Sequence, residues 1–394
     1  MIEGRRCGEK ESFHLIALIA LSAVLIGCSD EVSLTNSVGN QFIGTDVQIR
    51  RDTLHAISSS TFKQFLPMNG RVNLLGKTGN YEAFYPLQFQ FPQRDTILVL
   101  SAKLTLRAVS WCGDSAASFG FTAHKITRAW SQTTLQWDSV QSGFFESTPT
   151  GDPYLGSVES DTQLIVVSLD TAMVRQWLQP NTFTQYGLIL VPTPTTNVVR
   201  GIHAFLFDST QFYPTVEVIA GDRTGTPLDT TNYLSGFDTF VGNIDNLNSN
   251  PELMYVQSGV VYRSTLSFDI TSIPVGAIIN SAQMLLELNP AASKITKFTG
   301  DETVAAHLLT SSTDNNSFEN VGLLGSKATS SNVFSFDARG AVQLWVNGTN
   351  NGFLLRTTNL SEFSSFDLYA FYNQTASDPS LRPRLIVVYT TERN

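Results

Sequence analysis

Short apolar segments separated by turn-forming residues dominate the chain. Within these segments, apolar residues alternate with polar ones or run continuously for a few positions, and clusters of Gly, Pro, Asn, Asp and Ser lie between them. This pattern is typical of β-strands joined by turns. It predicts strands at 98–100, 103–106, 163–167 and 215–219 in the first half, and at 263–268, 283–288, 353–355 and 385–389 in the second.

Helical periodicity is confined to two short segments, 171–178 and 338–346. An aspartate precedes each segment, at the position expected of an N-cap. A tryptophan falls on the apolar face of each, and we expect both tryptophans to be buried in a core. The capping residues are Asp170 and Asp337, and the tryptophans are Trp177 and Trp345.

The second half of the chain repeats the first half in outline. Ser-Leu-Asp at 168–170 is matched by Ser-Phe-Asp at 335–337, and Tyr-Gly-Leu-Ile-Leu at 186–190 by Asn-Gly-Phe-Leu-Leu at 351–355. Together with the strand pattern, this repeat predicts an all-β chain with two tandem β-sandwich domains. We place them at 42–220 and 228–392, joined by the turn-rich linker 221–227.

The amino-terminal segment has the features of a lipoprotein signal peptide. Basic residues precede an apolar run at 15–26, which is shorter than the roughly 20 residues that a membrane-spanning helix needs. The run ends in Leu-Ile-Gly-Cys, a tetrapeptide that resembles a lipobox. We therefore expect cleavage after residue 27 and acylation of Cys28, which would anchor the chain to a membrane.

A polar stretch at 28–41 follows, and we expect it to be a flexible tether. Its Ser-Asp-Glu at 29–31 resembles the acidic signal that directs some bacterial lipoproteins to the outer face of the outer membrane. A plain polar tether is the alternative. The predicted location is the outer membrane, with the folded part exposed on the cell surface.

Charge and cysteine content restrict the function further. The formal net charge of −9 argues against nucleic-acid binding as the main activity. Of the three cysteines, Cys7 falls in the signal peptide and Cys28 is the expected lipidation site. Only Cys112 remains, so no intramolecular disulfide is expected and the cores must stabilise the fold.

Several blocks of sequence resemble a known family. Phe-Asp-Ile-Thr-Ser-Ile-Pro-Val-Gly-Ala at 268–277, followed by Ser-Ala-Gln-Met at 281–284, is similar to a stretch of DNRLRE-type domains. The segment from Trp130 to Asp138 is similar to the tryptophan-containing loop of that family. The resemblance implies a jelly-roll-like β-sandwich. Related modules include carbohydrate-binding ones associated with acidic polysaccharides, and also surface proteins without a known ligand.

Carbohydrate binding requires aromatic planes beside a few hydrogen-bonding groups. Aromatic residues near predicted loops and strand ends are the candidates, with cations close to them in sequence. The candidates are Trp111, Trp130, Trp137, Tyr233, Tyr255 and Tyr262, together with Lys125, Arg128 and Arg263. The alternative for the tryptophans of the 130–138 loop is a structural one, in which they cover the end of the sandwich.

Catalytic and metal-binding motifs are weak. The histidines lack the spacing of a metal pair, and no nucleophile elbow, Walker loop or dinucleotide fingerprint is present. A polysaccharide lyase or hydrolase remains the less favoured alternative, because two carboxylates suffice for glycoside hydrolysis. Structural calcium is the one cofactor to consider, since loop oxygens suffice to bind it. Its candidate ligands are Asp238, Asn243, Asp245, Asn246 and Asn248; the alternative is a solvated loop.

The sequence thus favours a surface-anchored, non-catalytic protein that binds polysaccharide or acts in adhesion. The competing hypothesis is a structural component of the cell envelope or of a surface assembly, with proteins as its partners.

Overall fold

The computed structural model describes residues 47–392, except 69, 95–96, 142, 161, 206–209, 245–246, 248–249 and 296–303. The predicted signal peptide, the tether and Cys28 lie outside the described residues. Arg51–Tyr389 form one compact unit. The other described residues, 47–50 and 390–392, are the outer ends of its first and last strands.

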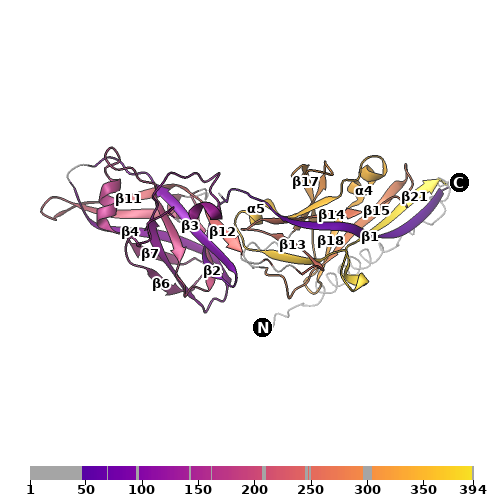
Figure 1. Cartoon of the computed structure of the whole chain (residues 1–394), viewed down its shortest axis with the longest axis horizontal. Helices are drawn as coiled ribbons and strands as arrows, with labels where there is room; N and C mark the ends of the chain where they lie inside the picture. The colour runs from indigo at the N-terminus through magenta and orange to yellow at the C-terminus, as the bar shows by residue number, and fades with distance from the viewer. Residues whose placement is uncertain are drawn as a thin grey trace, which may run out of the picture. The chain divides into compact units, whose positions relative to one another are not determined.

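The prediction of an all-β fold is confirmed, because the described residues form two large antiparallel sheets (Figure 1). Each strand predicted from the sequence overlaps a strand of these sheets, although the predictions at 163–167 and 283–288 each extend one residue beyond it. The N-terminal sheet consists of β2 (Val72–Thr78), β3 (Tyr81–Phe89), β4 (Leu98–Gly113), β5 (Ser118–Lys125), β6 (Tyr154–Ser157), β7 (Leu164–Ser168), β8 (Leu188–Pro192), β9 (Val198–His203), β10 (Thr215–Gly221), β11 (Pro227–Asp238) and β12 (Val241–Ile244).

The N-terminal sheet closes on itself like a barrel. Its order is β11-β10-β4-β9-β2-β3-β8-β5-β6, and β11 also pairs with β3. The long strands β3 and β4 change neighbours along their length, since β4 pairs first with β10 and β7 and then with β9. A strand that changes neighbours in this way lets one sheet enclose a core.

The C-terminal sheet consists of β1 (Val47–Lys63), β13 (Leu253–Gln257), β14 (Tyr262–Phe268), β15 (Ile278–Glu287), β16 (Val304–Leu309), β17 (Phe318–Gly325), β18 (Val333–Asp337), β19 (Phe353–Thr357), β20 (Leu368–Tyr372) and β21 (Arg384–Glu392). Its order is β17-β16-β19-β14-β1-β21-β15-β18, and β13 pairs with both β14 and β20.

The sheets divide the chain differently from the predicted boundaries. Strand β1, drawn in indigo in Figure 1, belongs to the C-terminal sheet, where Lys63 lies opposite Tyr262 and Ala56 opposite Phe268. Strands β11 and β12 belong to the N-terminal sheet. The predicted linker 221–227 is instead a hairpin turn between β10 and β11, in which the Asp222 carboxylate accepts hydrogen bonds from two backbone amides.

Each sheet has a core that one short helix completes. The helices are α3 (Thr171–Trp177) and α4 (Arg339–Val346), and Trp177 and Trp345 are buried on them. Asp170 caps α3 as predicted, since its side chain accepts from the amides of Ala172 and Met173. The prediction for Asp337 was wrong by one residue, because the N-cap of α4 is Ala338.

A third apolar cluster contains residues of both sheets. Tyr81 of β3 packs against Phe366, which precedes β20, with 3.6 Å between the ring centroids. Met68, Phe240 and Val260 belong to the same cluster. These three residues also form part of the wall of a pocket.

Candidate functional site

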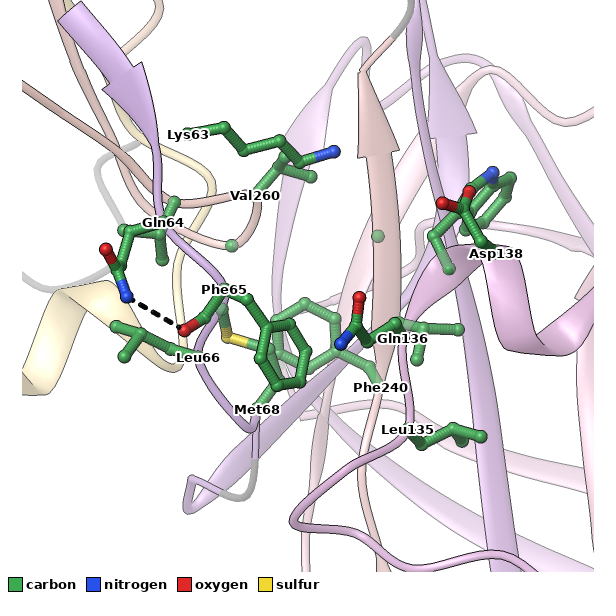
Figure 2. Close-up of a pocket in the computed structure, with 15 residues that line it drawn as sticks. Lys63, Gln64, Phe65, Leu66, Met68, Leu135, Gln136, Asp138, Phe240 and Val260 are labelled. Atoms are coloured by element: carbon green, nitrogen blue, oxygen red, sulfur yellow. Dashed lines mark hydrogen bonds between the residues drawn. The ribbon is translucent and has the colours of Figure 1, made fainter.

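A pocket of about 290 Å³ lies beside the end of β1 (Figure 2). Four segments line it: the end of β1 with the residues that follow it, the loop at 135–138, the start of β12, and the turn between β13 and β14. Buried Met68, Phe240 and Val260 give it an apolar wall. The pocket is therefore formed by segments that are distant in sequence.

Three aromatic residues line this pocket: Phe240 in the apolar wall, and Trp137 and Phe65 at the border. Trp137 begins the short 3₁₀ helix η1 (Trp137–Val140), and its ring lies 4.7 Å from that of Phe84. The side-chain amide of Gln141 donates to the Trp137 carbonyl at 3.1 Å, which stabilises the helical turn. Phe65 is 42% exposed, so one edge of the pocket offers an apolar surface to a ligand.

Polar side chains surround the apolar wall. Figure 2 shows Gln136 and Phe65 close to the middle of the pocket, with Lys63 and Asp138 on opposite sides. The Gln64 amide donates to the Phe65 carbonyl at 3.3 Å, which leaves its side-chain carbonyl available as an acceptor. Aromatic surface flanked by a few donors and acceptors is the usual chemistry of a small-molecule site.

Trp130 lies in the same loop region as Trp137 but does not line the pocket. Its indole Nε1–H donates to the carbonyl of Tyr186 at 2.8 Å, and its ring lies 4.9 Å from that of Phe237. These contacts fasten the loop to the residues that precede β8 and to β11. Both tryptophans thus pack against the same apolar cluster, but of the two only Trp137 lines the pocket.

Lys125 and Arg128, the cations predicted in the first half of the chain, stabilise the loop that follows β5. Lys125 pairs with Glu146 at 3.6 Å. The Arg128 guanidinium donates to the carbonyl of Ser139 at 2.8 Å and lies over the ring of Phe144. Both side chains therefore stabilise the loop that carries Trp137.

Trp111 lies apart from this pocket. It occupies β4 opposite Arg200, and its side chain is 37% exposed. Its neighbour Cys112 is half-buried, and burial raises the pKa of the thiol to about 12. At neutral pH the thiol is therefore protonated and a poor nucleophile.

Tyr255 and Tyr262 lie together in a second pocket, of about 480 Å³. Tyr255 is buried and Tyr262 is half-buried. Ser59 and Thr61 of β1, Ile244 of β12 and Asn373 also line this pocket. Tyr233, by contrast, is buried in the N-terminal core against Phe91.

Arg263 is not accessible to a ligand. Its guanidinium is buried and pairs with both carboxylate oxygens of Glu362, at 3.0 and 3.1 Å. Glu362 ends the short helix α5 (Asn359–Glu362) and also pairs with the buried guanidinium of Arg356. The charge of Arg263 therefore serves this buried cluster.

Of the predicted calcium ligands, the structure describes Asp238 and Asn243. Asp238 is buried and accepts from the Tyr85 hydroxyl at 2.7 Å and from the backbone amide of Phe205. Burial raises its pKa to about 6. Asn243 lies on β12, and Asp245, Asn246 and Asn248 are outside the described residues. The part of the chain that the structure describes holds no group of three or more His, Cys, Asp or Glu suited to a metal ion.

A pair of histidines occupies equivalent places in the two sheets. Nδ1 of His124 lies 2.8 Å from the carbonyl of Glu146, and Nδ1 of His307 lies 2.8 Å from the carbonyl of Glu319. A phenylalanine packs against each ring, Phe145 and Phe318 respectively. The sequence offered a signal for this match, since Phe-Glu occurs at 145–146 and at 318–319, but the loops before them differ in length.

Sequence reasoning also missed the β1 side of the pocket, formed by Lys63, Gln64 and Phe65. Phe-Leu-Pro at 65–67 after a polar strand was the available signal. The local pattern carries no information about which segment lies beside it.

The comparisons with known proteins give no family. No family model matches the chain, and no curated protein matches it. One similar solved structure is titled "Structure of infectious bursal disease virus Gt strain"; it is 10% identical, with 88% of this chain and 77% of that chain covered. Its TM-score of 0.11 carries no argument about fold or function. None of the described helices is long and apolar enough to cross a membrane.

Proposed function

We propose that the protein is a non-catalytic carbohydrate-binding or adhesion lipoprotein, held at the outer membrane through Cys28 and exposed on the cell surface. The observation that carries the binding function is the pocket bordered by Trp137 and Phe65. The resemblance of 268–284 to DNRLRE-type domains supports it independently of the pocket.

The chemistry of the pocket suits a sugar. A pyranose ring has apolar C–H faces and a rim of hydroxyls, so it requires an aromatic surface and groups that both donate and accept. Trp137 and Phe65 offer the aromatic surface, while the amides of Gln64 and Gln136 do both. The apolar wall of Met68 and Phe240 keeps water away from the ring faces.

The same pocket supports a non-catalytic role. Asp138 is the one carboxylate among its described lining residues. Glycoside hydrolysis by the usual mechanism needs two carboxylates about 5 to 9.5 Å apart. Asp138 has no such partner in the lining, so the arrangement favours binding without bond cleavage.

The second candidate function is a structural role in a surface assembly. Strand β17 is the last strand in the order of the C-terminal sheet, and its Val321 and Leu324 side chains are 85% and 64% exposed. An edge strand with exposed apolar groups can add a strand from another chain. This observation favours a protein partner at β17.

Glycan-array binding of the purified full-length chain tests the proposed function. We expect saturable binding to at least one glycan, reduced at least tenfold in affinity by Trp137→Ala. The matched control is Trp111→Ala, which removes a tryptophan that lines neither of the two pockets and should bind as the wild type does.

Binding should also survive EDTA, because the buried carboxylate of Asp238 is already hydrogen-bonded. Absence of binding across neutral and acidic glycans would reject the proposal. Concentration-dependent self-association abolished by Val321→Lys would then favour the structural role.

A further inference from the structure

We call the pocket at Trp137 the first pocket and the pocket at Tyr262 the second pocket. Residues of β1, of β12 and of the turn between β13 and β14 line both of them. On β1 and just after it, Ser59, Ser60 and Thr61 line the second pocket, and Lys63 and Gln64 line the first; of these, Ser59, Thr61 and Lys63 are alternate residues. Alternate residues of a strand share one face. The face of β1 that borders the second pocket therefore continues into the first.

Strand β12 shows the same relation. Gly242 lines the first pocket and Ile244 lines the second. These two residues also share one face of their strand. Gly242 leaves room beside the Tyr81 hydroxyl, since a Cβ at this position would lie 3.0 Å from the hydroxyl oxygen.

The turn between β13 and β14 is the third shared element. Val260 and Val261 line the first pocket, and Tyr262 lines the second. Tyr262 lies directly opposite Lys63 in the β1–β14 register. The two pockets thus meet at a cross-strand neighbour pair, whose side chains project on the same face.

We infer that the two pockets form one trough that binds an extended, uncharged oligosaccharide rather than a single sugar. This inference rests on the proposed function and specifies its ligand. The trough runs along β1 from Ser59 to Lys63, roughly 13 Å at about 3.3 Å per residue, before it reaches Phe65. That length accommodates more than one linked sugar.

The charges of the lining residues indicate a neutral ligand. In the first pocket Lys63 and Asp138 are the charged residues, and their charges cancel. The described lining of the second pocket has hydroxyls and amides but no charged side chain. Because the whole chain carries a net charge of −9, a polyanion would also be repelled at long range.

Chain-length dependence of binding tests the inference. Calorimetry with the full-length protein would use gluco- and manno-oligosaccharides of one to six sugars, with oligouronates of the same lengths as the acidic arm. We expect affinity for the neutral series to rise at least tenfold from one sugar to four, and to exceed that for the acidic series.

Two variants separate the pockets. Tyr262→Ala should remove the gain with chain length and leave the affinity for the shortest ligands unchanged, whereas Trp137→Ala should weaken all lengths. Tyr213→Ala is the matched control, because Tyr213 is similarly half-buried and lines neither pocket. Circular dichroism of each variant verifies the fold.

The outcomes distinguish the inference from the function on which it rests. Affinity that is independent of length, or unaffected by Tyr262→Ala, overturns the trough and leaves the first pocket as a sugar site. Tighter binding of oligouronates overturns the neutral ligand. Failure of both neutral and acidic series to bind contradicts the proposed function as well.

Discussion

Glu362 is enclosed by two guanidinium groups in the C-terminal sheet, where all three side chains are buried. A carboxylate in this position neutralises only one of the two positive charges. Phe318 lies over the Arg263 guanidinium and contributes a cation–π contact. The cluster therefore depends on Glu362 more than on either arginine.

Replacing Glu362 with Gln should destabilise the protein by about 3–5 kcal/mol, because it leaves buried guanidinium groups without a counter-charge. Urea unfolding monitored by tryptophan fluorescence measures the change. Asp229→Asn is the control, since Asp229 pairs with Arg94 at an exposed site and should have a small effect. Equal effects of the two variants would show that burial does not decide the contribution.

The buried histidines should make the fold sensitive to acid. Burial, together with the nearby Arg107 charge, lowers the pKa of His203 to about 4. An unfolded chain binds the proton near pH 6.5, so the native state loses stability as the pH falls from about 6.5 to 4. Burial also lowers the pKa of His124 and of His307.

The His203→Gln variant should show a shallower loss of stability over this pH range, measured by denaturant unfolding at a series of pH values. Asp238 acts in the opposite direction, since its raised pKa makes the native state bind a proton between about pH 6 and 4. Parallel pH profiles for the wild type and His203→Gln would contradict the assignment.

At the scale of single residues, burial was easier to predict than ligand contact. Trp177 and Trp345 were recognisable because helical spacing defines an apolar face from nearby residues. The burial of Arg263 could not be recognised in this way, because its partner Glu362 lies 99 positions away in sequence. A cation on a strand looks the same in the sequence whether it faces a ligand or a buried carboxylate.

At the scale of elements, the two sheets share a glycine at equivalent positions. Gly187 and Gly352 both precede a strand, and both have a φ of +87°. A Cβ at Gly187 would collide with the carbonyl oxygen of Leu87, and one at Gly352 would lie 2.7 Å from that of Leu266. The sequence repeat therefore preserves a backbone conformation as well as an apolar pattern.

Alanine at Gly187 or Gly352 should destabilise the protein by more than about 1 kcal/mol, because the side chain is incompatible with both the conformation and the space. The control is Gly340→Ala in α4, where a Cβ meets no atom within 4 Å. That variant should stabilise the protein by up to about 1 kcal/mol, since alanine favours a helix. Thermal unfolding of the three variants tests the prediction, and a stable Gly352→Ala would refute it.

Strand positions were predictable because alternation is a local signal. The strands at 215–219 and 353–355, for example, fall within β10 and β19. The pairing partners were not predictable. The hairpin turn at 221–227 has the same composition as a linker, and only the β10–β11 register distinguishes the two.

At the scale of the whole molecule, the pairing of β1 explains why the division into two sheets and the first pocket were not predicted from the sequence. The strand lies between β14 and β21 in the sheet order. Its polar and apolar residues fit many sheets equally well, and long-range pairing is specified by neighbours that are distant in sequence. Because β1 pairs in this position, the residues at its end line the first pocket, namely Lys63, Gln64 and Phe65.

The position of β1 also has a consequence for folding on the ribosome. Among the described strands it is synthesised first, yet its two neighbours are β14 and β21, the latter completed only at Glu392. The N-terminal sheet has all its strands available by Ile244 and can form during synthesis. The C-terminal sheet is complete only once β21 has been synthesised, so the edge of β1 that pairs with β21 stays open after β14 is available and is the segment that a chaperone would have to protect.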